Sequence, residues 1–485
     1  MGQSEQSWGG AMLVFSIQRL LIDLGQSRIT ALPLRVTNME SIRKFADLGL
    51  FRAKAPRYTS YPTANHFTTT VGPNEFASWI TSVPAGSEIS LYVHIPFCRR
   101  LCWFCACRTQ GTQSARPLAA YLETLRVEFD RLADTLPADI RLARMHWGGG
   151  TPTLLQPGMI TELANHITER LPLAPGAEFS VEIDPNEIDA PRLDALVEAG
   201  MNRASIGVQD FDLEIQSTIG RIQSFGHTES VVNRIRRAGV PSLNADILYG
   251  LPHQTIDKIT TTVQKLLSLT PDRVALYGYA HVPWMARRQS MIPSDALPTP
   301  EERLELFETA RQLFVWDGYQ GIGIDHFALP ADGLAIAQQK GNLRRNFQGY
   351  TNDNNDILIG LGASAISRLP QGYAQNSPAT SGYTALIRDG HFATTRGHIF
   401  RGDDVLRGKV IERIMCDLSI TPSDFGEDEP AVSSLVDGLD DVFGGVLVKT
   451  ADGIRVPPQA LPLVRMIAQF FDDYHYSPEG HSHAI

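Results

Sequence analysis

The chain has 485 residues, of which 43% are hydrophobic and 20% charged, a composition typical of soluble globular proteins. These proportions exclude a disordered chain, a collagen-like fibre and a disulfide-stapled miniature domain, and no apolar run approaches the ~18 residues that a transmembrane helix needs. The 43 Lys and Arg against 53 Asp and Glu leave a net charge of -10, so we expect neither nucleic acid nor a membrane among the partners.

Three parts follow one another along the chain. Residues 1–50 form an N-terminal extension that we expect to be dispensable for chemistry, and Met39 is an alternative start. The apolar stretch 12–15 is short and has no basic residue before it, so it lacks the design of a secretory signal. Residues 51–385 are the predicted catalytic domain with its N-terminal arm, and residues 386–485 are a small C-terminal domain.

Six short apolar runs in the catalytic part alternate with helical patterns and are predicted strands. They are residues 90–95, 144–147, 178–183, 203–208, 243–249 and 273–279. A helix after the first run begins at Pro117, and another begins with a capping box formed by Thr299 and Glu302. Six buried strands separated by helices predict an α/β fold with a parallel sheet of right-handed βαβ units.

The residues that follow the strands decide between an open sheet and a barrel. Polar or glycine residues stand at or just beyond nearly every strand end: Cys98, Gly148–Thr151, Glu182 and Asp184, Gln209, Gly250 and His281. Because chemistry in α/β barrels sits at this rim, the pattern favours a barrel over a doubly wound sheet. Beyond Gly402, helical patterns over 405–416 and 461–474 and a hairpin near 446–456 predict the mainly helical C-terminal domain.

The cysteines point to a metal site. Four of the five, Cys98, Cys102, Cys105 and Cys107, lie within ten residues, which indicates a metal in a compartment that keeps thiols reduced, so we expect the cytoplasm. The first three form C-x3-C-x2-C, and three thiolates on a [4Fe–4S] cluster leave one iron open to another ligand. Cys107 is a possible fourth ligand, although its spacing from Cys105 makes that geometry difficult.

Two other interpretations of the cysteine cluster exist. A structural zinc site would need a second ligand pair about 12–20 residues away, which the sequence lacks. A packing cluster is disfavoured because Arg99 and Arg100 lie inside the loop.

Glycines and buried carboxylates mark further candidate positions. Gly148-Gly149-Gly150-Thr151-Pro152 permits close approach of a ligand, or simply a tight turn, and it is not a dinucleotide fingerprint. Glu182 and Asp246 lie in apolar strands, where a carboxylate needs a partner such as a ribose hydroxyl or a buried cation. Tyr92 and His94 share one face of the first strand and lead into the cysteine loop, although a histidine there is also an ordinary core residue.

These motifs together resemble a known family. The segment from Leu91 to Cys107, Leu-Tyr-Val-His-Ile-Pro-Phe-Cys-x3-Cys-x2-Cys-x-Cys, is similar to the cluster loop of the radical S-adenosylmethionine (SAM) superfamily. Within it, the chain resembles the oxygen-independent coproporphyrinogen III oxidases from about Pro56 to the C-terminus. Cys107 fits this family, whereas the related haem-chaperone branch usually lacks it. The resemblance implies a partial (β/α)6 parallel barrel of the radical SAM type.

The resemblance also implies roles for individual residues. Cys98, Cys102 and Cys105 would bind the [4Fe–4S] cluster, with the amino and carboxylate groups of SAM on the open iron. Tyr92, His94 and Arg221 would form the catalytic set. Residues expected to contact SAM, with Gln348 and Ile366 placed near a second SAM molecule, are Tyr92, Phe104, Gly149, Gly150, Thr151, Glu182, Gln209, Arg221, Asp246, Ala280, Gln348 and Ile366. From charge alone, Arg57, Arg344 and Arg345 are expected to pair with substrate carboxylates.

The implied activity is oxidative decarboxylation of two propionates of coproporphyrinogen III to vinyl groups, giving protoporphyrinogen IX in haem biosynthesis through a 5′-deoxyadenosyl radical. An external donor such as flavodoxin or ferredoxin would supply the electron, and a monomer is expected. The alternatives are a haem-binding chaperone, a radical SAM enzyme such as a methyltransferase, and a zinc-bound interaction module. The stretches 325–328 and 345–351 resemble the oxidases and favour the first interpretation.

Overall fold

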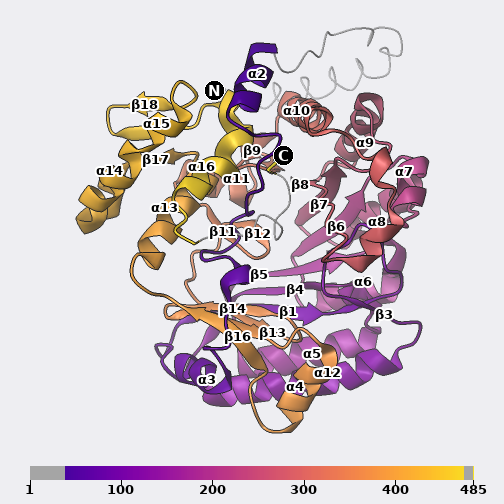
Figure 1. Cartoon of the computed structure of the whole chain (residues 1–485). Helices are drawn as coiled ribbons and strands as arrows, with labels where there is room; N and C mark the ends of the chain where they lie inside the picture. Colours follow the sequence, from indigo (N-terminus) through magenta and orange to yellow (C-terminus); the bar gives the residue numbers. More distant parts are fainter. Residues whose placement is uncertain (1–38, 475–483) are drawn as a thin grey trace, which may run out of the picture.

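The computed structural model describes residues 39–474 and 484–485 (Figure 1). Residues 1–38, which make up most of the predicted N-terminal extension, lie outside the described residues. The rest of that extension begins with α2 (Met39–Asp47), and its Phe45 and Leu50 are buried against residues of the C-terminal part.

The centre of the molecule is a sheet in which all six predicted strands run parallel. They are β1 (Glu88–Ile95), β4 (Arg141–Gly149), β5 (Leu173–Ile183), β6 (Arg203–Gln209), β7 (Ser242–Tyr249) and β8 (Arg273–Gly278). They are neighbours in the order β1-β4-β5-β6-β7-β8, so each strand lies beside the next predicted one. The predicted partial (β/α)6 barrel is confirmed.

Helices connect successive strands and cover the outside of the barrel (Figure 1). They are α4 (Arg116–Thr135), α5 (Pro157–Arg170), α6 (Ala190–Glu198), α7 (Leu213–Thr218), α8 (Phe225–Arg237), α9 (Ile256–Ser268) and α10 (Pro300–Trp316). The predicted capping box at the start of α10 is present, with the Thr299 side chain accepting from Glu302 N–H. Apolar faces such as that of Leu125 and Phe129 on α4 are fully buried against the sheet, which is the main source of folding free energy.

The sheet extends beyond the predicted strands at both edges. Beside β1 lies β13 (Leu358–Leu361), which is parallel to it, followed by the antiparallel strands β14 (Ile366–Leu369), β15 (Gly372–Asn376) and β16 (Thr394–Ile399). Beside β8 lie the antiparallel strands β10 (His326–Ala328) and β9 (Gln320–Ile322). Helix α12 (Thr380–Arg388) packs on α4, and α3 (Pro73–Thr81) lies near it. The 12-stranded sheet stays open, since its edge strands β16 and β9 are not paired with each other.

The C-terminal part is mainly helical, with a small sheet, as predicted. Its elements are α13 (Asp404–Asp417), β17 (Ser419–Ile420), α14 (Glu429–Asp437), α15 (Leu439–Phe443), β18 (Val448–Thr450), β19 (Gly453–Arg455) and α16 (Val464–Phe470). Strand β16 follows position 385 but belongs to the large sheet, and the C-terminal apolar cluster includes Phe45 and Leu50. The domain boundaries from sequence therefore stay predictions.

In the chain, α11 (Gly333–Gln339) and the hairpin of β11 (Arg344–Asn346) and β12 (Gly349–Thr351) lie between β10 and β13 of the large sheet. No helix among the described residues is long and apolar enough to cross a membrane.

Candidate active site

The three predicted cluster cysteines lie on one loop at the carboxyl end of β1. Short strands β2 (Phe97–Cys98) and β3 (Gln110–Gly111) pair in parallel and close this loop at its base. The N–H of Trp103 donates to the carbonyl of Ile219 at 2.9 Å and so fixes the middle of the loop to the segment after α7. The loop is therefore held at its base and at its middle.

The thiols of this loop differ in their environment. All four are free, with Cys98, Cys102 and Cys105 partly buried and Cys107 exposed. Burial raises the pKa of Cys98 to about 11 and also raises the pKa of Cys102. A hydrogen bond from Cys107 instead lowers the pKa of Cys105 to about 6. In this arrangement Cys107 stays protonated, and its thiol donates a hydrogen bond to the sulfur of Cys105.

The donor set of the loop fits a four-iron cluster. Within residues 39–474 and 484–485, no three His, Cys, Asp or Glu side chains converge as a single metal ion requires. A cluster makes a different demand, because each thiolate binds a separate iron. Three free thiols on one loop meet that demand, and the guanidinium of Arg221 lies 3.7 Å from Cys102 Sγ, where it stabilises a thiolate.

The glycine run after β4 lies against the strand that carries the cysteine loop. The N–H of Thr151 donates to the Phe97 carbonyl at 2.8 Å. Gly149 has φ +108°, and a Cβ there would lie 2.4 Å from the ring of His94. A Cβ at Gly150 would lie 2.5 Å from the Phe97 carbonyl oxygen. Glycine is required at both positions because β4 and the cluster loop approach each other so closely.

Glu182, near the end of β5, reaches across to this glycine run. Its Oε2 accepts the N–H of Gly149 at 3.0 Å, and its Oε1 lies 3.4 Å from Nε2 of His146. Burial alone would raise the pKa of Glu182, but these hydrogen bonds outweigh it and lower the pKa below its ordinary value. The carboxylate is therefore ionised at neutral pH and available to hydroxyl or ammonium donors.

Tyr92 and His94 form a hydrogen-bonded pair on β1. The Tyr92 hydroxyl lies 2.9 Å from His94 Nδ1, and the Tyr92 ring stacks on His146 at 5.7 Å. On its other side, His94 Nε2 lies 3.4 Å from the carbonyl of Arg108 in the cysteine loop. Burial lowers the pKa of His94, so its ring is neutral at pH 7.

Arg221 connects the cluster loop to the rims of β5 and β6. Besides Cys102, its guanidinium contacts Asp184 Oδ2 at 3.1 Å and the carbonyl of Gly207 at 2.9 Å. Gln209 ends β6 with φ +68°, and its side chain lies close to Gly207. These contacts explain how a cationic group is held beside the thiols, where it is only 9% exposed.

Asp246 faces the interior of the barrel rather than its outer surface. Asn244 Nδ2 donates to its carboxylate at 2.8 Å, and burial raises the pKa of Asp246 to about 6. Glu182, Asp246 and Gln348 line one cavity of about 210 Å³. Arg203 Nε and Nη1 in the same cavity are buried without a hydrogen-bond partner in the described part of the chain, so a polar ligand would find donors there.

The remaining predicted contacts are more spread out. Gln289 donates to the carbonyls of Phe104 at 2.7 Å and Ala280 at 3.0 Å, which joins the cluster loop to the segment after β8. Ala280 lines a second cavity, described below, and Ile366 on β14 lines neither cavity. The structure thus brings most predicted residues to one rim, and the proposed roles of Ala280 and Ile366 rest on the resemblance alone.

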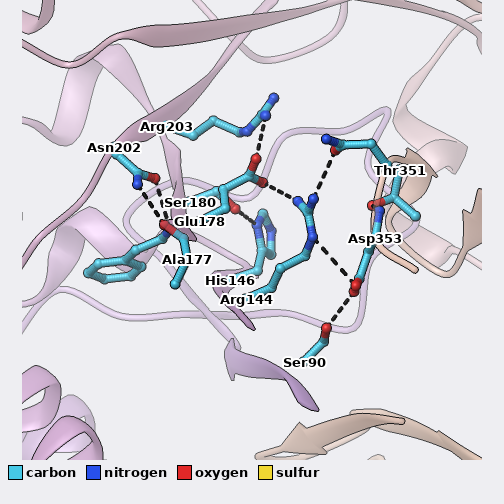
Figure 2. A network of polar contacts seen from close by, with 12 residues as sticks. Ser90, Arg144, His146, Ala177, Glu178, Ser180, Asn202, Arg203, Thr351 and Asp353 are labelled. Carbon is cyan, nitrogen blue, oxygen red and sulfur yellow. Dashed lines mark hydrogen bonds and ion pairs between the residues drawn. The ribbon is translucent and has the colours of Figure 1, made fainter. Parts of the chain in front are cut away.

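Sequence reasoning missed a polar network inside the barrel, which Figure 2 shows. At its centre Glu178 on β5 binds Arg144 at 2.8 Å and also pairs with Arg203, and Arg144 reaches Asp353 at 3.6 Å. The two arginines lower the pKa of Glu178 to about 2 despite its burial. The available signal was polar residues at every second strand position, such as Arg144 with His146, which marks an inward strand face.

The three arginines expected from charge lie near one another but have different partners, and Arg345 Nε donates to the carbonyl of Arg57 at 3.2 Å. Arg344 pairs with Glu412 and Asp356, each at 3.3 Å, and is occupied by these carboxylates. Arg345 stacks its guanidinium on the ring of Tyr350 at 4.3 Å. Arg57 instead lines the second cavity, about 430 Å³ in volume, at the ends of β7 and β8, together with Arg303 of α10 and Arg465 of α16, which the sequence analysis did not single out. Such a group has no strong sequence signal, because its members come from distant segments.

A parallel barrel with a three-cysteine loop at its rim is the architecture expected of a radical SAM protein. The sequence model of the Radical SAM superfamily matches residues 92–266 of the chain, which contain the cysteine loop and most of the barrel. The structure is similar to that of coproporphyrinogen III oxidase (HemN) from Escherichia coli, a radical SAM enzyme, with a TM-score of 0.82 and 36% identity over 86% of this chain and 98% of that one.

Two further relatives make the family specific. The oxygen-independent coproporphyrinogen III oxidase of Paracoccus denitrificans is 60% identical over 92% of this chain and 100% of its own length. That of Cereibacter sphaeroides is 54% identical over 91% of this chain and 100% of its own length. The chain belongs to the oxygen-independent coproporphyrinogen III oxidase family.

Proposed function

We propose that the chain converts coproporphyrinogen III to protoporphyrinogen IX by oxygen-independent oxidative decarboxylation of two propionate side chains. The observation that carries this proposal is the loop of three free cysteines beside Arg221, in a chain similar over its length to named oxidases. Each propionate loses CO₂, one hydrogen atom and one further electron, and becomes a vinyl group. The reducing electron comes from a donor such as flavodoxin or ferredoxin, and an external acceptor takes up the electron that the substrate releases.

Cys98, Cys102 and Cys105 would hold a [4Fe–4S] cluster, and the rim residues around Gly149 and Glu182 would hold SAM. When bound, cluster and SAM together supply the one-electron chemistry that produces a 5′-deoxyadenosyl radical. The chain's own groups orient and shield these partners. Glu182 is an ionised acceptor for ammonium or ribose donors, and its pKa below the ordinary value supports this role.

Other residues would line and position the site. His94 is neutral and hydrogen-bonded to Tyr92, so the pair supplies a polar but uncharged wall next to the cysteine loop. Asp246 and Gln348 line the interior cavity, where a second SAM molecule is proposed to bind. Gln289 holds Phe104 and the segment of Ala280 together and so limits the access of water from that side.

We further propose that the protein works in the cytoplasm, because its free thiols need a reducing compartment. Anaerobic assay of the reconstituted protein with SAM, a reductant and coproporphyrinogen III should yield protoporphyrinogen IX. A Cys102→Ala variant should form no product, whereas an exposed control such as Arg388→Met should match the wild type. Stable haem binding without decarboxylation would instead support a haem chaperone, and product from Cys102→Ala would refute the cluster assignment.

A further inference from the structure

The cavity of about 430 Å³ at the ends of β7 and β8 carries a surplus of positive charge. Its described lining residues include four lysine or arginine side chains and one aspartate: Lys54, Arg57, Arg303, Arg465 and Asp325. The acidic one already has cationic and hydrogen-bonding neighbours, since Asp325 lies 2.7 Å from His326 Nδ1 and 3.9 Å from Arg345. Among the described side chains that line the cavity, positive charges therefore outnumber negative ones.

Main-chain oxygens hold Arg57 and Arg303 in this cavity. Arg57 donates to the carbonyl of Gly278 at 2.6 Å, and Arg303 donates to the carbonyl of Gly250 and to an oxygen of Ile485, each at 3.2 Å. Within the described residues, neither guanidinium has an Asp or Glu oxygen within 4.0 Å. Burial and the charge of Arg57 lower the pKa of Arg303 and bring that of Arg465 to about 9. An anion in the cavity would relieve this repulsion between like charges.

The positive charge of the cavity distinguishes between two possible carboxylate ligands, that of SAM and that of a tetrapyrrole propionate. The carboxylate of a second SAM is one candidate, but SAM also carries an ammonium and a sulfonium, so a positively charged cavity repels the molecule as a whole. A propionate on a tetrapyrrole brings only negative charge. The cavity also has an aromatic wall that can pack against the pyrrole rings of a tetrapyrrole, since Tyr249 lines it and Trp284 is 58% exposed there.

The cavity also lies beside the cysteine loop. Ala280 forms part of its wall, and Gln289 connects the carbonyl of that residue to the carbonyl of Phe104 in the loop. A macrocycle anchored in the cavity by one edge would have its remaining side chains directed along the same rim. Binding at this place is therefore compatible with chemistry at the cluster.

We propose that Arg57, Arg303 and Arg465 bind propionate carboxylates of the tetrapyrrole substrate and anchor it for reaction. The proposal rests on the proposed function for the identity of the substrate. Arg303 is the central ligand, because its planar guanidinium has further N–H donors beyond those that bind Gly250 and Ile485. Arg465 has a second, structural role, since it donates to the carbonyls of Pro56 and Ala484, each at 3.0 Å.

The test uses the full chain, anaerobically reconstituted, and the fluorescent porphyrin coproporphyrin III as the probe. Arg303→Met should weaken porphyrin binding at least ~10-fold, since a charge-assisted bidentate contact is lost. The porphyrin affinity of Arg303→Lys should lie between those of the wild type and Arg303→Met. Arg57→Met is an independent second variant. Arg388→Met, an exposed arginine on α12, is the matched control and should bind as the wild type does. Circular dichroism verifies that each variant is folded.

Kinetics and SAM binding separate the possible outcomes. The proposal predicts a raised KM for coproporphyrinogen III with a smaller change in kcat, and an unchanged affinity for SAM in equilibrium dialysis. Folded Arg303→Met and Arg57→Met variants that bind porphyrin normally would overturn it, as would a loss confined to SAM binding. If the wild type forms no product but binds coproporphyrin III through Arg303, this site stands and the proposed function fails.

Discussion

At the scale of single residues, the site depends on how closely the strands approach one another. Gly149 is the sharpest example, because its φ of +108° and the His94 ring 2.4 Å from an added Cβ both exclude a side chain. His94 in turn is fixed by Tyr92 and by the cysteine loop. A single methyl group would therefore disturb the barrel rim and the cluster loop together.

Gly149→Ala should lower the free energy of unfolding by about 2–4 kcal/mol, from backbone strain and overpacking. Gly158→Ala is the matched control, because Gly158 lies in α5 with no atom within 4 Å of an added Cβ. That control should be neutral or stabilising by up to about 1 kcal/mol. Urea denaturation measures both, and equal stabilities of the two variants would contradict the close approach described.

At the scale of elements, the network around Glu178 ties neighbouring strands together on the inside of the barrel (Figure 2). Glu178→Gln removes the anion that Arg144 and Arg203 share and should cost about 3 kcal/mol of unfolding free energy. Glu162→Gln, which breaks the exposed pair of Arg126 with Glu162 between α4 and α5, should cost less than about 1 kcal/mol. Similar losses in both variants by urea denaturation would show that the inner network does not stabilise the strands.

The sequence predicted the elements of the barrel better than those at its edges. The parallel strands are short runs rich in apolar residues with polar residues or glycine near their ends, and Gln209, Tyr249 and Gly278 end β6, β7 and β8 within one residue of prediction. Strands β9, β10 and β13 are three or four residues long, too short for a periodic pattern. Their positions depend on long-range pairing, which local sequence does not reveal.

The same reasoning applies to the site. Cys98, Cys102 and Cys105 share one loop, so their spacing alone predicts their proximity. Arg303 and Arg465 come from helices far apart in the chain, and only the packing of the C-terminal part against the barrel brings them together. Such a cavity is a property of the tertiary structure. Of the three arginines that charge alone favours, Arg57 lines this cavity, whereas carboxylates already occupy Arg344.

At the scale of the whole molecule, Glu128 joins the barrel to its antiparallel extension. From α4 it accepts the N–H of Gly362 at 2.7 Å after β13, the amide of Asn376 on β15 at 2.6 Å, and the hydroxyl of Tyr383 on α12 at 2.8 Å. Burial raises the pKa of Glu128 to about 7 in spite of these bonds. A group so placed makes the stability of the fold depend on pH.

The direction of this pH dependence follows from the number of protons that Glu128 binds in the folded and unfolded states. Between the ordinary value of 4.5 and about 7, folded Glu128 binds more protons than unfolded Glu128, so its stabilising contribution is complete below 4.5 and is lost as pH rises through 7. The full change is about 3 kcal/mol. Denaturation at pH 5 and pH 8 should show that Glu128→Gln flattens this dependence, whereas Glu123→Gln, at an exposed position of α4, leaves it unchanged. Parallel pH profiles of the wild type and Glu128→Gln would contradict the assignment.

The most direct measurement is electron paramagnetic resonance of the anaerobically reconstituted, reduced protein with and without SAM. If three cysteines leave one iron open, added SAM will change the spectrum of the reduced cluster. Cys107→Ala will keep four irons per chain and the same response, whereas Cys102→Ala will lose the cluster. A spectrum that SAM does not alter, or loss of the cluster in Cys107→Ala, would contradict the account.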